Sequence, residues 1–139
     1  HPYLGFEPLR PFFDYTDRLT FVLCATSEGH RVQRLHVDET GEPLWRWVAQ
    51  EAAAIDAALG GGRLGLVVGA TVMRELHEAR QLAPALPLLS PGVGAQGGSW
   101  PPPPALVNVS RGILYRSRGA DFAQAAGRAA EEYVHAGTV

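Results

Sequence analysis

The chain has 139 residues, of which 46% are hydrophobic and 19% are charged, and its formal net charge is −2. This composition is typical of one globular domain that can bury a core of its own. The basic residues are scattered, so nothing indicates nucleic-acid binding, and no apolar run reaches the roughly 18 residues that a membrane-spanning helix needs.

Four short apolar runs recur along the sequence, and most of them are continuous rather than alternating. They occupy residues 19–25, 64–69, 86–89 and 106–114. Continuous apolar runs of this length are typical of strands that are buried on both faces, as in a parallel sheet. The runs therefore predict four parallel strands.

A helix is expected between the first two runs. Pro43 suits its first position, and the three glycines 60–62 end it. Apolar side chains recur at a spacing of three or four from Leu44 onward, which predicts one buried face. Because Trp45 and Trp47 are two positions apart, they cannot share that face. We expect Trp47 in the core and Trp45 at a contact surface.

Two more helices follow. One is expected over residues 72–82, with Thr71 as its N-cap. Another begins after Asp121, which can cap it, and places Phe122, Ala126, Ala129 and Tyr133 on one face. Near the N-terminus, prolines permit only a short helix. Alternation of strands and helices predicts an α/β fold built from βα units.

The connection between the third and fourth strands differs from the others. It spans only about 14 residues and contains four consecutive prolines, 101–104. Consecutive prolines cannot lie inside a helix and favour a stiff extended segment. A parallel crossover usually contains a helix, and here we expect that helix to be missing.

A glycine-rich loop follows the third strand. Its sequence, Gly92-Val-Gly-Ala-Gln-Gly97, formally matches the dinucleotide-binding pattern G-x-G-x-x-G. That pattern requires a helix after the loop and an acidic residue about 20 positions further on. Here prolines follow the loop, and Arg111 stands near the position of the acidic residue. The context therefore argues against a dinucleotide site.

Phosphate binding explains this loop better. Glycines let backbone N–H groups approach an anion closely, and Gln96 adds an amide donor. Arg111, at the end of the next strand, can make a two-pronged contact to phosphate. In β/α barrels the loops after strands seven and eight often form such a site. The alternative is that the glycines only form a tight turn and that Arg111 is a surface ion-pair residue.

Five segments, in this order, closely resemble the C-terminal half of bacterial orotidine 5′-phosphate decarboxylases. Each segment alone is weak, but their order and spacing cover nearly the whole chain. The segments are Pro2-Tyr3-Leu4-Gly5, Leu23-Cys-Ala-Thr-Ser27, Leu66-Val-Val-Gly-Ala-Thr71, Pro91-Gly-Val-Gly-Ala-Gln-Gly-Gly98 and Asn108-Val-Ser-Arg-Gly-Ile113.

The resemblance implies a (β/α)8 TIM barrel, of which residues 1–139 supply roughly strands five to eight. It implies decarboxylation of orotidine 5′-monophosphate to UMP in pyrimidine biosynthesis, with no metal or organic cofactor. The expected partners are the small-molecule nucleotide and a second copy in a homodimer, with no nucleic acid and no membrane. A cytoplasmic location is expected, because no signal-peptide pattern opens the sequence.

Binding roles also follow from the resemblance. Ser27 matches a serine that hydrogen-bonds the pyrimidine ring, and Pro91 matches a proline that packs near the base. Gln96 and Arg111 match the phosphate contacts. Backbone amides in the stretch Ser110-Arg111-Gly112 are expected to help hold the phosphate.

No catalytic residue is expected in this chain. The family's Asp-x-Lys-x-x-Asp array, whose lysine protonates the carbanion, has no counterpart, and the chain contains no lysine at all. Arginine cannot replace it, because its pKa above about 12 prevents ready proton transfer. The chain opens without a methionine, so we expect it to be one half of a longer enzyme and inactive alone. A non-catalytic half-barrel that binds a phosphorylated ligand is the alternative.

Two further residues have simpler interpretations. Cys24 lies in a strand with no His or Asp partner, so it is expected to be a small buried hydrophobe rather than a nucleophile. As the only cysteine, it also excludes an internal disulfide. His30 is expected to be a solvated loop histidine rather than a ligand contact.

Overall fold

The computed structural model describes residues 2–27, 30–37, 39 and 41–137. Four parallel strands form the main sheet, in the order β1-β4-β5-β6, which confirms the predicted parallel α/β fold. A separate antiparallel pair, β2 and β3, was not predicted. The strands are β1 (Thr20–Ala25), β2 (His36–Val37), β3 (Glu42–Pro43), β4 (Leu64–Val68), β5 (Leu88–Pro91) and β6 (Ala105–Asn108).

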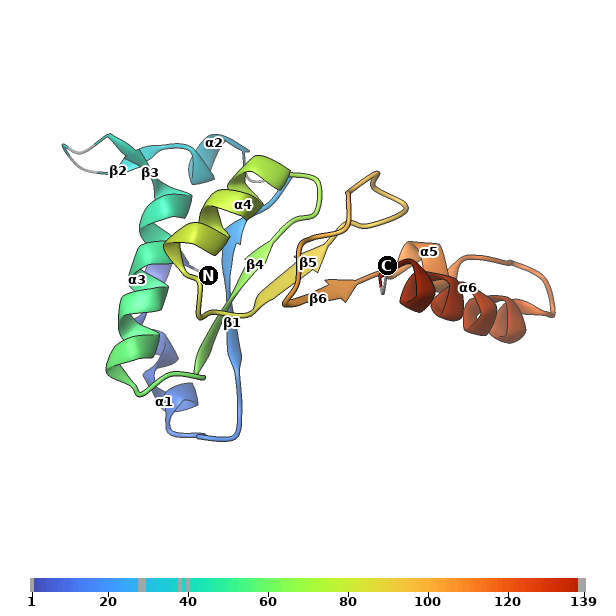
Figure 1. The fold of residues 1–139 in the computed structure, drawn as a ribbon, viewed down its shortest axis with the longest axis horizontal. Coiled ribbons are helices and arrows are strands. Elements are labelled where there is room, and N and C mark those ends of the chain that lie inside the picture. Colours follow the sequence, from blue (N-terminus) through green and yellow to red (C-terminus); the bar gives the residue numbers. More distant parts are fainter. Residues whose placement is uncertain (1, 28–29, 38, 40, 138–139) are drawn as a thin grey trace.

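Three long helices accompany this sheet. Figure 1 shows α3 and α4 side by side along the sheet, whereas α5 and α6 lie beyond β6. The long helices are α3 (Leu44–Ala58), α4 (Met73–Leu82) and α6 (Phe122–Ala136). The short ones are η1 (Pro2–Leu4), η2 (Glu7–Leu9), α1 (Arg10–Phe13), α2 (His30–Gln33) and α5 (Arg111–Leu114).

The core lies between the sheet and the helices α3 and α4. Side chains that alternate along the strands point toward these helices, as the twofold period of a strand requires. Leu64, Leu66 and Leu88 are fully buried there, and Val48 of α3 and Leu76 of α4 are buried opposite them. Burial of this apolar surface is the main stabilising term of the fold.

The opposite face of the sheet carries a continuous apolar row. Register pairs Leu23 with Val67, Val67 with Leu89, and Leu89 with Leu106, so the four side chains cross all four strands. Leu23 is 41% exposed and Leu106 is 55% exposed. In a closed barrel such a row forms one layer of the packed interior. This face therefore has the character of a barrel interior.

The amino-terminal end of the same face is filled by an aromatic ring. Phe21 pairs with Gly65, and a Cβ atom on Gly65 would lie 2.5 Å from Cε1 of Phe21. Only glycine leaves room for the ring at this position. The ring of Phe21 therefore lies across β4 below the apolar row.

Several sequence expectations are wrong in detail. Trp45 is buried, at 5% exposure, whereas Trp47 is only partly buried and contacts the ring of Phe6. The buried face of α3 is therefore rotated relative to the predicted one. It runs through Ala49 and Ala52, small residues that a pattern of large apolar side chains does not indicate. Alanine packs closely where a larger residue would not fit.

Helix and strand ends also differ from expectation. Val72, not Thr71, is the N-cap of α4, and no side-chain hydrogen bond caps that helix. On α6, Ala125 and Ala129 are buried, whereas Phe122 is 61% exposed. The fourth strand ends at Asn108, because the apolar residues that follow belong to the short helix α5. The apolar run 106–114 thus joins two elements of different type.

The predicted absence of a helix between β5 and β6 is confirmed, since residues 92–104 are all described and contain none. Arg80 of α4 secures this connection. Its guanidinium donates to the carbonyl of Leu86 at 3.0 Å and to the carbonyl of Pro104. Burial lowers the pKa of Arg80 from its usual value. One arginine thus joins α4, the residues before β5 and the end of the extended connection.

Asp56 is a buried carboxylate that the sequence reading did not single out. It lies on the inner face of α3 at 4% exposure and accepts three backbone hydrogen bonds. Its Oδ2 accepts from the N–H of Gly62 at 3.1 Å, and its Oδ1 accepts from Arg63 at 2.7 Å and Leu64 at 2.8 Å. These bonds fix the turn that leads into β4, and charged acceptors make them stronger than neutral ones.

Replacing Asp56 by alanine should destabilise the protein strongly. The change leaves up to three backbone donors without an acceptor, and we expect the free energy of unfolding to fall by about 2–4 kcal/mol. Urea denaturation followed by circular dichroism measures the change. Asp14→Ala is the control, because Asp14 is exposed, and this variant should stay within about 0.5 kcal/mol of wild type. Equal effects of the two substitutions would contradict the role of Asp56.

Candidate functional site

The carboxyl ends of β5 and β6 lie level with each other. Pro91, the last residue of β5, pairs directly with Asn108, the last residue of β6. The glycine loop that follows β5 and the segment Ser110-Arg111-Gly112 that follows β6 therefore begin at the same edge of the sheet. This edge is where α/β proteins place their ligands.

The glycine loop is a compact turn that needs its glycines. Gly92, Gly94 and Gly97 have φ angles of 107°, 80° and 73°, which residues with a Cβ atom rarely adopt. The N–H of Gly97 donates to the carbonyl of Gly94 at 2.8 Å, and the N–H of Gly98 donates to that of Gly92 at 3.0 Å. Two hydrogen bonds thus close the loop on itself.

Gln96 lies back over the start of this loop. A Cβ atom on Gly92 would lie 2.9 Å from Oε1 of Gln96, so the missing side chain makes room for the amide group. The loop is also tied to β4, because the N–H of Ala70 donates to the carbonyl of Pro91 at 2.8 Å. The amide of Gln96 thus lies beside the carboxyl end of β5.

The segment after β6 presents Arg111 on the other side. Arg111 is the first residue of α5, and its side chain is exposed, with no carboxylate partner among the residues that the structure describes. The hydroxyl of Ser110 donates to Oδ1 of Asn108 at 3.3 Å. The first N–H groups of any helix lack acceptors within it. This segment therefore offers a guanidinium and backbone donors together.

A small hollow of about 80 Å³ lies between the two segments. Its volume suits a phosphate group rather than a whole nucleotide. Five of the six predicted binding residues line it together with other members of the two loops. The lining residues are Pro91, Gly92, Val93, Ala95, Gln96, Asn108, Val109, Ser110, Arg111 and Gly112. Their role in binding phosphate stays a prediction.

Ser27 is the predicted residue that does not line this hollow. It follows β1, which is separated from β5 by β4, although all these strands end at the same edge. A ligand that reached both places would have to extend across β4. The side chain of His30 lies outside the part of the chain whose side chains are described, so the expectation for it is untested.

Asn108 is a lining residue that the sequence reading did not select. It is the last residue of β6, and its side-chain oxygen accepts the hydrogen bond from Ser110. Its position between a strand and a polar segment was visible in the sequence. What the sequence did not reveal is that it directly faces Pro91 across the sheet.

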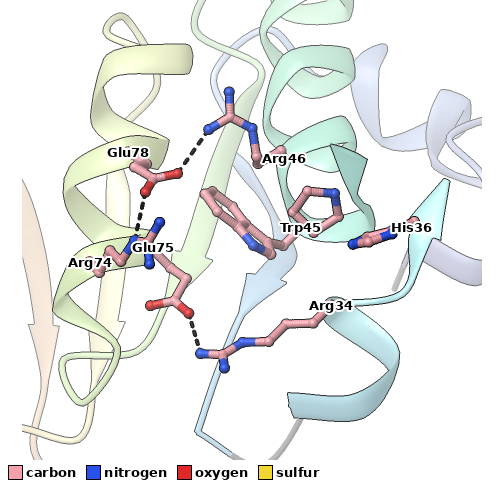
Figure 2. Close-up of a pocket in the computed structure, with 8 residues that line it drawn as sticks. Arg34, His36, Trp45, Arg46, Arg74, Glu75 and Glu78 are labelled. Atoms are coloured by element: carbon pink, nitrogen blue, oxygen red, sulfur yellow. Dashed lines mark hydrogen bonds and ion pairs between the residues drawn. The ribbon is translucent and has the colours of Figure 1, made fainter. Parts of the chain in front are cut away.

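A wider cavity of about 510 Å³ lies elsewhere, between the β2–β3 pair, α3 and α4. Figure 2 shows its charged side chains already paired: Arg34 with Glu75, and Arg46 and Arg74 with Glu78. The hydrogen bond from Arg74 helps to hold the pKa of Glu78 below its usual value. Because each of these guanidiniums has a carboxylate, the cavity attracts anions weakly. We interpret these ion pairs as contacts that join α4 to α3 and to the residue Arg34 that precedes β2.

Other kinds of site find little support in the described residues. No group of three or more His, Cys, Asp or Glu side chains there could hold a metal ion. Within that same part of the chain, no helix has the length and apolar character needed to cross a membrane. The small hollow at the ends of β5 and β6 is therefore the candidate that the geometry favours.

Cys24 is buried, as the sequence predicted. It is 2% exposed, and its thiol donates to the carbonyl of Trp45 at 3.3 Å. Burial raises the pKa of Cys24 to about 12. The thiolate is the reactive form of cysteine, so this side chain is not a nucleophile at neutral pH.

Comparison with known proteins agrees with this geometry. No family model matches the chain. It is 46% identical to the orotidine 5′-phosphate decarboxylase of Thermomicrobium roseum, over 94% of the chain and 50% of that protein. It is 41% identical to the orotidine 5′-phosphate decarboxylase of Herpetosiphon aurantiacus, over 96% of the chain and 52% of that protein. The solved structure of the Leishmania donovani OMP decarboxylase has a TM-score of 0.72 and 34% identity, over 99% of this chain and 55% of that one.

The parallel sheet, with helices on one face and an apolar row on the other, is therefore half of a β/α barrel. Over nearly its whole length the chain is homologous to orotidine 5′-phosphate decarboxylases, and the resemblance predicted from its five motifs is confirmed. The chain spans about half the length of the curated relatives it matches.

The burial of Cys24 predicts that its thiol resists alkylation. With a pKa of about 12 in the folded protein and about 8.5 in an unfolded chain, iodoacetamide at pH 8.5 should modify Cys24 only after unfolding in urea. The raised pKa also adds stability that is present at neutral pH and is lost as the pH rises toward 12. Mass spectrometry follows the modification, and rapid labelling without urea would contradict the burial.

Proposed function

We propose that the protein decarboxylates orotidine 5′-monophosphate to UMP, in pyrimidine biosynthesis, and that this chain is its C-terminal half. The observation that carries the proposal is the small hollow at the ends of β5 and β6, where Gln96 and Arg111 meet. Homology to orotidine 5′-phosphate decarboxylases supports it independently of that geometry.

In this proposal the hollow holds the phosphate of the nucleotide. Arg111 supplies a fixed positive charge and two parallel donors, which suits phosphate better than a point charge does. Gln96 adds an amide donor, and backbone N–H groups of Ser110, Arg111 and Gly112 complete the set. Because the phosphate is remote from the reacting carbon, these contacts supply binding energy for orienting the substrate.

The base lies toward the other strands in the same proposal. Pro91 lines the hollow and ends β5, so it can pack against the pyrimidine ring next to the phosphate end. Ser27 follows β1 and would hydrogen-bond the ring from the far side of β4. The nucleotide would thus extend along the carboxyl edge of the sheet from β6 toward β1.

The chemical step itself needs groups that this chain does not supply. Removal of CO₂ leaves a carbanion that an acid must protonate, and the chain contains no lysine. Arginine holds its proton too tightly to act as that acid. The proposal therefore places the proton donor outside these 139 residues. It also includes a homodimer in the cytoplasm and a reaction without metal or organic cofactor.

The second candidate is a non-catalytic half-barrel that binds a phosphorylated ligand. The same hollow favours it, because phosphate binding requires only the residues that line it. The two candidates differ in whether CO₂ is released. They agree on the role of Arg111.

A decarboxylation assay separates them. The protein produced from its complete gene should convert orotidine 5′-monophosphate to UMP, whereas a verified preparation of residues 1–139 should not, because it lacks a proton donor. Liquid chromatography of the nucleotides measures both. A complete protein that binds UMP but releases no CO₂ would favour the non-catalytic candidate, and activity of the 139-residue chain would contradict the assignment of the donor.

Replacing Arg111 by alanine should weaken binding of UMP but not of uridine. Loss of a charge-assisted contact should lower the affinity for UMP by roughly 10- to 100-fold and leave that for uridine within about twofold. Isothermal titration calorimetry measures both. Arg118→Ala is the matched control, because Arg118 is also exposed and does not line the hollow. Equal weakening of both ligands would remove Arg111 from the phosphate role.

A further inference from the structure

Tyr133 of α6 contacts both segments that enclose the small hollow. A Cβ atom on Gly94 of the glycine loop would overlap the hydroxyl oxygen of Tyr133. A Cβ atom on Gly112, in the segment after β6, would lie 2.5 Å from the same oxygen. The Tyr133 hydroxyl therefore occupies a gap that exists only because both neighbours are glycines.

The ring of Tyr133 is held from behind by a second aromatic contact. Trp100, which follows the glycine loop, packs against it with ring centroids 6.4 Å apart and planes tilted by 50°. Trp100 in turn lies against Gly137 at the end of α6, where a Cβ atom would approach its ring to 2.7 Å. Tilted aromatic pairs at this distance are favourable. Tyr133 is thus fixed between the two segments rather than free to rotate away.

Tyr133 does not line the hollow itself. It lines a separate apolar groove of about 500 Å³ on the outer side of β6, together with Trp100 and Val107. The hydroxyl therefore reaches the two glycines from this groove rather than from within the hollow. A residue in this position can affect bound phosphate through the backbone of the two segments.

We infer that Tyr133 is a positioning residue for the phosphate site: its hydroxyl sets the separation between the glycine loop and the Arg111 segment. This inference rests on the proposed phosphate role of the hollow and adds a residue from α6 to it. Hydrogen bonds to phosphate weaken steeply outside a narrow range of distance and angle. Donors on two separate loops reach one anion together only if the loops are held at a fixed spacing.

Gly112 offers a selective test, because its φ angle is not in the left-handed region and its backbone accepts alanine. The Cβ atom of Gly112→Ala collides with the Tyr133 hydroxyl, and Tyr133→Phe removes the colliding oxygen. The nearest ring carbon then lies 3.1 Å away, which small shifts can relieve. Tyr115→Phe is the matched control, since Tyr115 is 68% exposed and follows α5, which packs against α6.

The expected result is rescue in the double variant. In the protein from its complete gene, Gly112→Ala should lower the affinity for UMP about tenfold, with uridine changed less than about twofold. Adding Tyr133→Phe should restore UMP affinity to within about threefold of wild type, and adding Tyr115→Phe should restore none of it. Calorimetric titration gives the affinities. If the double variant Gly112→Ala, Tyr133→Phe loses as much UMP affinity as the two single variants together, the inference is overturned.

A second variant covers the case in which Gly112→Ala does not fold. Tyr133→Ala removes the ring and hydroxyl together, and it should lower the affinity for UMP while leaving that for uridine unchanged. Unchanged UMP affinity, or equal loss for both ligands, would overturn the inference. Arg111→Ala separates this outcome from failure of the proposed function. If Arg111→Ala does not discriminate UMP from uridine, the phosphate site itself is wrong; if it does, only the role of Tyr133 is in question.

Discussion

The candidate site depends on one feature of the sheet, the parallel pairing of β5 with β6 in a register that sets Pro91 opposite Asn108. Because the two strands end level, a glycine loop and an arginine separated by more than a dozen residues of sequence open onto the same small hollow. A shift of one residue would turn each side chain to the other face of the sheet. The buried rows between the sheet and α3 and α4 hold this register in place.

Much of this arrangement was predictable from the sequence. The strands could be predicted because continuous apolar runs indicate burial on both faces of a sheet. The proximity of Gln96 and Arg111 could also be predicted, because consecutive parallel strands end at the same edge. The burial of Trp45 and the role of Asp56 could not be predicted, because alanines blurred the face of α3 and the partners of Asp56 are backbone groups. The contact of Tyr133 depends on the absence of two Cβ atoms, which hydrophobic periodicity does not report.

The extended connection between β5 and β6 shows how a barrel can dispense with a helix. A helix would normally cover the outer face of these strands. Here Arg80 reaches from α4 to the carbonyl of Pro104, and Trp100 packs against Tyr133 of α6. Because no helix covers β6 there, a groove that is lined in part by Val107 lies along its outer side. The hydrogen bond from Arg80 and the packing of Trp100 on Tyr133 thus hold the connection in place without a helix.

The ring of Phe21, which lies across Gly65, determines which end of the inner face of the sheet is open. It closes the inner face of the sheet near the amino ends of β1 and β4, while the carboxyl ends stay open. On the face that this half-barrel contributes, the open end is therefore the one that carries the proposed binding groups. A ligand of the proposed site would therefore approach this half of the barrel past the carboxyl ends of the strands rather than past Phe21.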